Sequence, residues 1–415
     1  MSPTESIQSL CPHINLANPS SYQQTPFDWF KELRSNHPVI WHDDPETGVG
    51  FWVVTKREDI DYISRHPRLF SSSKRGFVFN EHSEEHLQAL RNMILCMDPP
   101  DHIKYRKIIA AAFKPQTIDA MEPFLRREAR SIVDKIAPRG ECEFVTELAA
   151  HLPMAVICKL VGAPLQDGEK INRWANACLG HADAEYSSQG LDMWQATQEI
   201  FVYAQSLADK YRGSDKDNLT VQLINANIDG SSLSDEEFGY FFFLLLIAGP
   251  ETTRTATTTG MKLLMEHPDQ LQKLVDDPSL IPGAVEEILR YDPPVIMFRR
   301  TAMENVELRG QPIKKGDKVV FFYSSANHDE DIFDQPEKFD VTRGCHMDLG
   351  RAHRSFGFGE HFCIGAHLAR LQLKVIFSEM LPRLRNPKPA GNYVRLCSRD
   401  VTAPKSMPIS FDAEL

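Results

Sequence analysis

Residues 356–365 read FGFGEHFCIG, a short stretch that places one cysteine, Cys363, inside a glycine-rich loop. Gly357, Gly359 and Gly365 allow the backbone to turn and to come close to a flat group. A helical pattern begins directly after the cysteine, so backbone N–H groups and the positive end of the helix dipole favour a thiolate there. The stretch therefore predicts a cysteine thiolate that is held beside a planar face.

A thiolate in this setting is the arrangement that ligates the iron of a haem. The pattern Phe-x-x-Gly-x-His-x-Cys-x-Gly is met by Phe356, Gly359, His361, Cys363 and Gly365. It resembles the haem-binding signature of the cytochrome P-450 family, the haem-thiolate monooxygenases. The resemblance implies haem b, iron protoporphyrin IX, with an axial thiolate from Cys363 and further contacts from Phe356, Gly357, His361 and Gly365.

The composition is that of an ordinary globular protein. The chain has 415 residues, of which 42% are hydrophobic and 25% charged, and no linker-like segment divides it. We therefore expect a single domain over residues 1–415. The formal net charge of −11 argues against a nucleic-acid partner. The eight cysteines have no metal-binding spacing, which favours reduced thiols in a cytoplasmic protein.

The chain also shows no membrane signal. Its start, MSPTESIQSLCPHINL, has neither the basic nor the apolar region of a signal peptide. The strongest apolar run, Phe241–Ala248, falls far short of the roughly 20 residues that span a bilayer. We expect a protein without a membrane anchor.

A long helix is predicted from Asp235 to His267, where Pro268 ends it. Ser234 and Glu237 form a capping box at its start. Because its first half is strongly apolar, the helix must cross the interior of the protein.

The middle of this helix, AGPETT at residues 248–253, resembles the oxygen-binding segment of the family. Ala248 is small and leaves room for dioxygen and substrate. The Thr252 hydroxyl can bond the Ala248 carbonyl and can also donate toward dioxygen, while Glu251 can relay protons from solvent. Glu251 and Thr252 are therefore the candidate catalytic residues. Pro250 departs from the family pattern and predicts a kink.

Another helix carries a candidate structural network. Glu287 and Arg290, within EEILR, lie three residues apart on one face and resemble the ExxR helix of the family. Arg343 is the candidate third partner, with Lys338 as the other possibility. The resemblance implies that this network holds the core near the cysteine loop and takes no part in chemistry.

Four cationic positions match the contacts that the family makes with the haem propionates: His102, Arg106, Arg300 and His361. His102 and Arg106 are four residues apart on one helical face. Arg299 competes with Arg300, and alternation along a strand would send the two side chains to opposite faces.

The resemblance covers nearly the whole chain and implies a mainly α fold with small β-sheets. In this cytochrome P-450 fold, a triangular prism, haem lies between the long central helix and the cysteine loop. The implied enzyme uses O2 and two electrons. Because the chain has no flavin, NAD or iron–sulfur motif, we expect electrons from a ferredoxin with an NAD(P)H-dependent ferredoxin reductase. A basic patch for that partner, or merely scattered surface charge, is formed by Lys104, Lys107, Arg351, Arg354 and Lys374.

The substrate is less well defined by the sequence. Several tracts are similar to the bacterial subgroup that oxidises sterol side chains and methyl-branched lipids, which predicts hydroxylation of an apolar terpenoid, steroid or branched lipid. A linear alkane or fatty acid is the alternative substrate, and a haem-thiolate gas sensor or carrier is the alternative class. The expected pocket walls are apolar: Phe77, Phe79, Ile94, Leu95, Leu244, Ala248, Val295, Ile296 and Met297.

Overall fold

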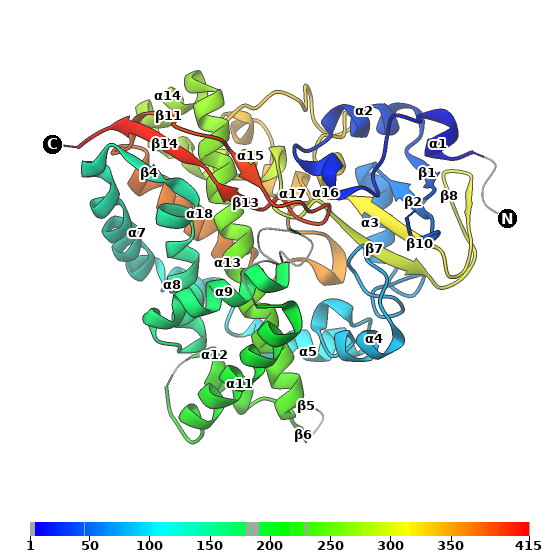
Figure 1. Cartoon of the computed structure of the whole chain (residues 1–415), viewed down its shortest axis with the longest axis horizontal. Helices are drawn as coiled ribbons and strands as arrows, with labels where there is room; N and C mark the ends of the chain where they lie inside the picture. The colour runs from blue at the N-terminus through cyan, green and yellow to red at the C-terminus, as the bar shows by residue number, and fades with distance from the viewer. Residues whose placement is uncertain are drawn as a thin grey trace.

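The computed structural model describes residues 5–44, 46–179, 183, 191–216, 218–228 and 231–414. Most helices gather on one side of the molecule, and the largest sheet lies on the other side beside the N-terminal helices (Figure 1). The predicted mainly α architecture with small sheets is confirmed.

The helices follow the apolar periodicity of the sequence, and most of them bury one face. The longer ones are α2 (Phe27–Asn36), α3 (Arg57–Arg65), α4 (Glu84–Leu90), α5 (Asp101–Ala110), α6 (Pro115–Asp119), α7 (Glu122–Ile136), α8 (His151–Val161), α9 (Gly168–Leu179), α11 (Met193–Tyr211), α12 (Leu219–Ile224), α13 (Asp235–Glu266), α14 (Pro268–Asp276), α15 (Ile281–Tyr291) and α18 (Ala366–Met380). The short ones are α1 (Ile7–Leu10), α16 (Tyr323–Ala326) and α17 (Leu349–Ala352).

The largest sheet has five strands in the order β1 (Val39–His42), β2 (Phe51–Val54), β10 (Lys318–Phe322), β7 (Met297–Ala302) and β3 (Phe70–Ser71). Only the β2–β10 pairing is parallel within this sheet. On β7, Arg300 pairs with Val319 and Arg299 with Val320, so the pleat directs the two arginines to opposite faces.

The other sheets are small. One has the order β11 (Arg385–Pro389), β14 (Pro408–Asp412) and β4 (Glu141–Glu143). The remaining described strands form three two-stranded pairs: β12 (Val394–Arg395) with β13 (Pro404–Ser406), β8 (Val306–Leu308) with β9 (Gln311–Ile313), and β5 (Asn227–Ile228) with β6 (Ser231–Ser232).

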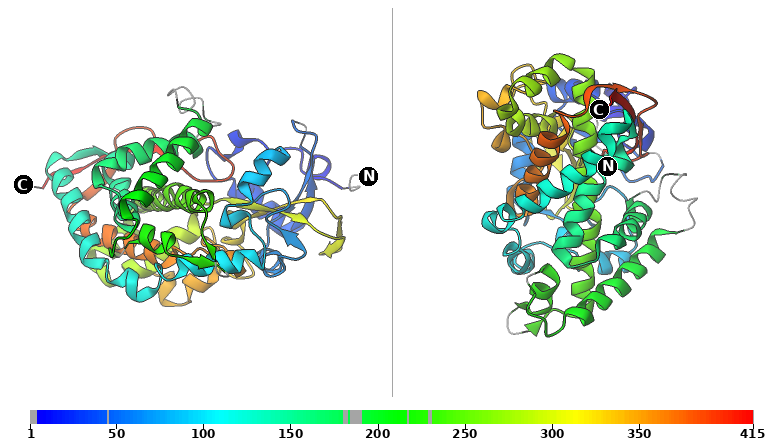
Figure 2. Two further views of the ribbon diagram at one scale, coloured as in Figure 1. Left: turned by 90° about the horizontal axis from the view of Figure 1, so that it is seen from below. Right: turned by 90° about the vertical axis from the view of Figure 1, so that its left-hand side faces the viewer.

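Helix α13 passes through the middle of the molecule, where it contacts α8, α9, α11, α15 and α18 (Figures 1 and 2). Its capping box forms as predicted: the Ser234 N–H donates to the Glu237 carboxylate at 2.7 Å, and the Glu237 N–H donates to Ser234 Oγ at 3.2 Å. The helix continues without a break through Pro250. The kink expected at this proline stays a prediction.

The largest core cluster joins α7, α8, α13, α15 and α18. One described stretch, Phe144–Val161, is long and apolar enough to cross a membrane by length and composition alone. It is longer than the uninterrupted apolar run Phe241–Ala248, but Glu147, His151 and Lys159 interrupt it. Because 61% of the stretch is buried inside the fold, packing against other helices accounts for its apolar character.

Candidate active site

A cavity lies between α13 on one side and the cysteine loop, residues 356–365, with α18 on the other. It leaves about 260 Å³ in which the centre of a water molecule fits. Residues from α5, α8, α15 and β7 complete the walls. Segments from both halves of the chain therefore build one enclosed space around the predicted cysteine.

Cys363 faces this cavity, and its exposed surface is turned toward the cavity that it lines. Its backbone N–H donates to the Phe356 carbonyl at 2.8 Å, which closes the loop. Gly359 has a φ of +69°, and a Cβ there would lie 2.5 Å from the Ser64 carbonyl oxygen, so only glycine fits. Helix α18 begins at Ala366, directly after the loop, close to the predicted start.

The environment of the thiol acts in two directions. Burial raises the pKa of Cys363 above its ordinary value. A hydrogen bond from the Gly365 N–H, together with the positive charges of Arg106 and Arg370, acts to lower that pKa. The loop therefore supplies donors and positive charge for a thiolate in a place where burial alone would favour the thiol.

On the opposite wall, α13 opens a small surface toward the cavity. Ala248 and Gly249 are exposed there, although most residues of the second half of this helix are buried. Thr252 also lines the cavity, and its hydroxyl donates to the Ala248 carbonyl at 2.9 Å, as predicted. A side chain at Gly249 would come within 3.4 Å of Ile157, so small residues keep this stretch open.

Glu251 does not line this cavity. Its carboxylate is 6% exposed and forms an ion pair of 2.6 Å with Arg254, three residues further along α13. Sequence reasoning missed Arg254, although the spacing of three residues is a signal for such a pair. The two candidate catalytic residues are thus neighbours in the chain that face different spaces.

Three of the four predicted cationic residues line the cavity: His102, Arg106 and His361. The rings of His102 and His361 lie 4.1 Å apart. Arg300 is 6% exposed, and its charge acts on both histidines. The structure therefore brings all four predicted residues together.

These cations lack anionic partners. Among the described residues, neither Arg106 nor Arg300 forms an ion pair; Arg106 donates to the Phe362 carbonyl at 2.6 Å and Arg300 to the Arg299 carbonyl at 2.7 Å. The Nδ1 atom of His102 is buried without a partner. The nearby Asp98 carboxylate is engaged by the backbone N–H groups of residues 72 and 73 and by a serine hydroxyl. An anionic ligand is the group that this cluster lacks.

Burial and the neighbouring positive charges lower the pKa of both histidines. Burial, followed by the charge of Arg106, lowers the pKa of His102 to about 4. Burial and the charges of Arg300, His102 and Arg106 hold the pKa of His361 well below its ordinary value. Arg299, in contrast, bonds the Glu81 carboxylate at 2.7 Å. Arg300 is therefore the arginine of this pair that is left for a ligand.

The donor set of the cavity fits haem. A thiol on a glycine-rich loop provides a ligand for iron, the apolar walls suit a flat macrocycle, and the unpaired cations suit its two carboxylates. The orphaned His102 Nδ1 is the clearest sign that a polar group belongs beside it.

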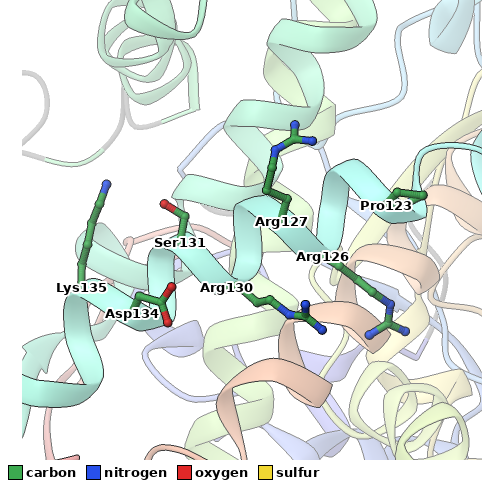
Figure 3. A pocket seen from close by; sticks show the side chains of 7 residues that line it. All are labelled: Pro123, Arg126, Arg127, Arg130, Ser131, Asp134 and Lys135. Atoms are coloured by element: carbon green, nitrogen blue, oxygen red, sulfur yellow. The ribbon is translucent and has the colours of Figure 1, made fainter.

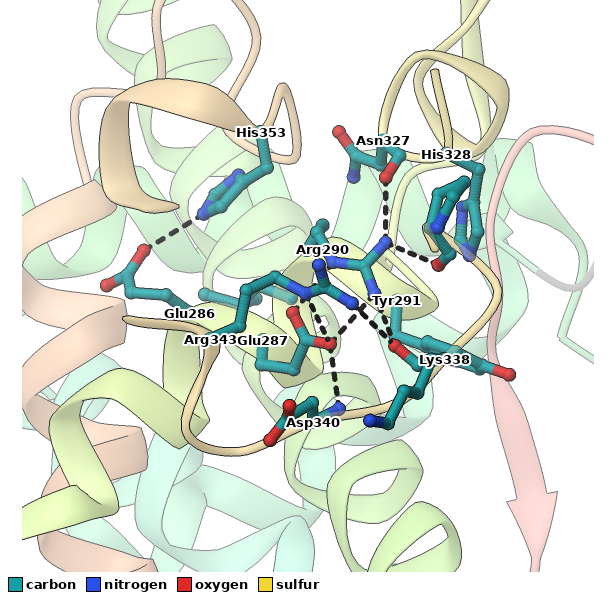
Figure 4. A network of polar contacts seen from close by, with 12 residues as sticks. Glu286, Glu287, Arg290, Tyr291, Asn327, His328, Lys338, Asp340, Arg343 and His353 are labelled. Carbon is teal, nitrogen blue, oxygen red and sulfur yellow. Dashed lines mark hydrogen bonds and ion pairs between the residues drawn. The ribbon is translucent and has the colours of Figure 1, made fainter. Parts of the chain in front are cut away.

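Behind the cysteine loop, the predicted ion-pair network forms completely (Figure 4). Glu287 and Arg290 are both 0% exposed and are joined by two hydrogen bonds of 2.7 and 2.8 Å. Arg343 lies 3.3 Å from Glu287 and is the third partner, as predicted. Lys338 contributes its backbone carbonyl rather than its side chain, accepting from both arginines. Further carbonyls, of Asn327 and Pro336, accept from Arg290 at 2.9 Å.

The structure separates the predicted substrate walls into two groups. Five of them line the cavity: Ile94, Leu95, Leu244, Ala248 and Val295. Phe77 packs edge-on against Phe298, which lines the cavity in its place.

The assignments of Phe79, Ile296 and Met297 to the pocket wall were wrong. These side chains pack into a separate core against one face of the five-stranded sheet. On β7 the pleat turns Met297 away from the cavity that Phe298 lines, and Phe79, which lies outside the strands, packs against Phe51 of β2. Sequence reasoning also missed wall residues whose apolar character matches any core residue: Phe241, Leu245, Pro294 and Phe298.

Arg354, which was expected to contribute to the basic patch, is buried, and so is the neighbouring His353. Arg354 is 3% exposed and binds both oxygens of Asp61, at 2.5 and 2.7 Å. His353 is 4% exposed and contacts the Glu286 carboxylate at 2.9 Å. Arg351, in contrast, is exposed. The predicted basic patch therefore loses Arg354, because ion pairing draws it into the fold.

A second surface feature is a shallow hollow along α7 (Figure 3). It lies on one helix, where Arg126 and Arg130 pair with Glu379. The hollow has no cysteine and no apolar wall comparable to that of the cavity, and it offers no catalytic arrangement. Its lining residues are Pro123, Arg126, Arg127, Arg130, Ser131, Asp134 and Lys135.

Comparison with known proteins agrees with this geometry. The family model described as Cytochrome P-450 matches residues 170–277 and 277–392. A steroid C26-monooxygenase of Mycobacterium tuberculosis is 37% identical over 94% of this chain and 90% of that protein. A methyl-branched lipid omega-hydroxylase of the same species is 36% identical over 92% of this chain and 90% of that protein. A solved Mycobacterium marinum structure of the family, in complex with pseudoionone, superposes with a TM-score of 0.89 at 36% identity and covers 99% of this chain and 100% of that one.

Proposed function

The chain belongs to the cytochrome P-450 family and is a monooxygenase, and from this premise we propose that it hydroxylates an unactivated C–H bond of an apolar terpenoid, steroid or branched lipid. The observation that carries the proposal is the wall of the cavity around Thr252. It is built from aliphatic and aromatic side chains and has no charged group on the α13 and β7 side: Leu244, Leu245, Ala248, Val295 and Phe298. Such a wall selects an apolar ligand.

The relatives support this substrate class. Two of them are a steroid monooxygenase and a methyl-branched lipid hydroxylase, and a similar structure holds pseudoionone. Each of these substrates belongs to its own protein, and the shared feature is an apolar and branched carbon skeleton. We infer the same chemical class for this chain because the wall of its cavity is apolar.

We propose haem b as the cofactor. Cys363 would ligate its iron, Phe356, Gly357 and Gly365 would lie against its face, and His102, Arg106, Arg300 and His361 would bind its propionates. When bound, haem supplies the activation of O2 that allows one oxygen atom to enter a C–H bond.

The remaining steps belong to the chain itself. The apolar walls exclude water and hold the substrate against the small surface formed by Ala248 and Gly249. The Thr252 hydroxyl donates to the Ala248 carbonyl in the structure, and it must rotate away from that carbonyl to present its one O–H donor toward that surface. Glu251 takes protons from the solvent side of α13 and passes them toward Thr252.

Electrons must come from another protein, because the chain carries no motif for a flavin, a nicotinamide or an iron–sulfur cluster. We propose a ferredoxin with an NAD(P)H-dependent reductase, docking near the cysteine loop in the cytoplasm. The candidate basic residues that remain at least partly exposed are Lys104, Lys107, Arg351 and Lys374. Reduction that slows steeply with salt would support this docking site, and a flat response would remove it.

The proposal is tested by titrating the ferric haem protein with steroids, branched lipids, terpenoids and linear fatty acids while the Soret band is recorded. We expect a low- to high-spin shift with the branched and polycyclic ligands, because they displace water from the iron. A shift confined to linear acids would select the alternative substrate. A normal thiolate signal in the reduced CO spectrum, without a shift for any ligand, would contradict the apolar pocket.

A further inference from the structure

On the side of α13 away from the cavity lies a second, much smaller hollow. It is lined by residues of α9, of α13 and of the C-terminal hairpin, residues 394–406, which β12 and β13 form: Asn176, Leu179, Glu251, Arg254, Leu396, Ala403 and Lys405. It offers about 10 Å³ for the centre of a water molecule. This volume is close to the lower limit for holding one water.

Most of the wall of the hollow is apolar, but two charged residues in it are almost completely removed from solvent. Glu251 and Arg254 are each 6% exposed and form the ion pair described above. The Arg254 Nε–H is buried and has no partner among the described residues. On another wall, the Lys405 ammonium lies 3.1 Å from both carboxylate oxygens of Asp183. A buried donor without an acceptor is destabilising, and one water molecule would satisfy it.

The hollow lies close to bulk solvent. Leu396 lines it and also lines an open surface groove between the N-terminal segment and the C-terminal hairpin. The groove includes Gln23, Trp29, Tyr393 and Arg395. A single apolar side chain therefore stands on the border between the groove and the hollow.

We propose that this hollow holds one water molecule bonded to Arg254 Nε and the Glu251 carboxylate, and that Arg254 is the positioning residue that holds Glu251 against this water. The inference rests on the proposed role of Glu251 as a proton relay. The water accepts a proton from solvent and gives one to the Glu251 carboxylate. The carboxylic acid leaves Arg254, passes its proton to the Thr252 side of α13, and returns as the carboxylate to the ion pair.

The first experiment removes the water without touching a polar group. Ala403→Val adds two methyl groups to the wall of the hollow. The matched control is Ala208→Val on α11, because Ala208 and Ala403 are both 4% exposed and Ala208 lines neither space. A high-resolution crystal structure should show the water in the wild type and lose it in Ala403→Val. A dry hollow in the wild type would overturn the proposal, whatever the activity.

The same two variants are compared for product formed per NADH consumed and for the solvent kinetic isotope effect. We expect Ala403→Val to lower the product yield about ten-fold and to raise the isotope effect, since a positioned proton donor contributes about 10²–10⁴-fold. Ala208→Val should match the wild type in both. Equal yields and isotope effects for all three proteins would also overturn the proposal.

The role of Arg254 is tested by Arg254→Met and Arg254→Lys. Arg254→Met removes the partner of Glu251 and should lose coupling to the same extent as Ala403→Val. Arg254→Lys keeps the charge but not the Nε–H, so it should restore part of the yield and retain the raised isotope effect. If Arg254→Met remains fully coupled, Arg254 is no positioning residue. If the wild type converts none of the apolar ligands, the proposed substrate class is rejected. The crystal structure would still show whether the hollow holds a water molecule.

Discussion

Two clusters of buried charge lie on either side of the cysteine loop, and they differ in one respect. Around Glu287 and Arg290, hydrogen bonds within the chain satisfy both buried ions. Around His102 and Arg300, the Arg106 and Arg300 guanidinium groups lie beside histidines whose pKa is lowered, and neither arginine forms an ion pair with a described carboxylate. The first arrangement is complete without a ligand, and the second is not.

This difference indicates what each cluster does. A buried ion pair with all its hydrogen bonds stabilises one arrangement of the backbone, because removal of either partner leaves a bare charge. A buried cation without a partner destabilises the empty protein and therefore stabilises whichever anion arrives. The first cluster holds the fold behind the cysteine, and the second lacks an anion, which we propose the carboxylates of haem supply.

The largest effect is expected in the complete network. Arg290→Met leaves the buried Glu287 carboxylate with the Arg343 guanidinium at 3.3 Å and the Asp340 N–H at 3.0 Å. We expect a loss of about 3–5 kcal/mol in the free energy of unfolding. Urea titration followed by circular dichroism measures this loss.

The matched control is Arg212→Met, which breaks an ion pair with Asp209 of the same three-residue spacing on the surface of α11. Both partners there are more than 60% exposed, so the change should stay within about 1 kcal/mol. If the two variants lose the same stability, burial does not distinguish the networks.

A smaller effect, which differs between the two variants, is expected for the neighbouring arginines of β7. Arg299→Met breaks the bond to Glu81 and should lower the stability of the cofactor-free protein by about 1.5–3 kcal/mol. Arg300→Met removes a charge that has no carboxylate partner, so the stability of the cofactor-free protein should not fall. Arg300→Met should, however, release haem faster, as measured by haem transfer to an acceptor protein.

Two outcomes would contradict the roles given to Arg299 and Arg300. If Arg300→Met destabilises the cofactor-free protein as much as Arg299→Met, the Arg300 guanidinium has a structural partner. If both variants release haem at the wild-type rate, neither arginine binds the cofactor.

The smallest effect concerns pH. Burial and Arg106 lower the pKa of His102 to about 4 in the folded protein, below its ordinary value of 6.5. Between these two values the unfolded chain binds the proton more readily, so stability falls as the pH drops from 6.5 toward 4. In His102→Phe, the free energy of unfolding of the cofactor-free protein should depend less steeply on pH than in the wild type, by up to about 1.4 kcal/mol per pH unit. If urea titrations between pH 6.5 and about 4 give the same pH dependence of stability for the variant and the wild type, His102 does not stay neutral in the folded protein.

The sequence predicted residues whose role follows from local geometry. The spacing within EEILR placed Glu287 and Arg290 on one helical face, and the turn length in α13 placed the Thr252 hydroxyl at the Ala248 carbonyl. Alternation along MFRRTA separated Arg299 from Arg300. Each of these depends only on the period of a helix or a strand.

The errors arose where local geometry does not decide the outcome. Phe79, Ile296 and Met297 have the same apolar character as the true cavity wall, and only the packing of the sheet directs them elsewhere. Arg354 has the composition of a surface residue, yet Asp61, nearly 300 positions away in the chain, draws it into the fold. Periodicity carries no information on such distant partners.

The sequence by itself determined the cysteine loop, the long helix and the mainly α fold, because glycine positions, caps and apolar periodicity act over a few residues. Tertiary structure alone decided which cations were left unpaired, that Glu251 turns away from the cavity toward Arg254, and which apolar side chains form its wall. Those outcomes depend on the sum of burial and partner geometry at one place in space. Burial and partner geometry are both defined only once segments far apart in the chain have come together.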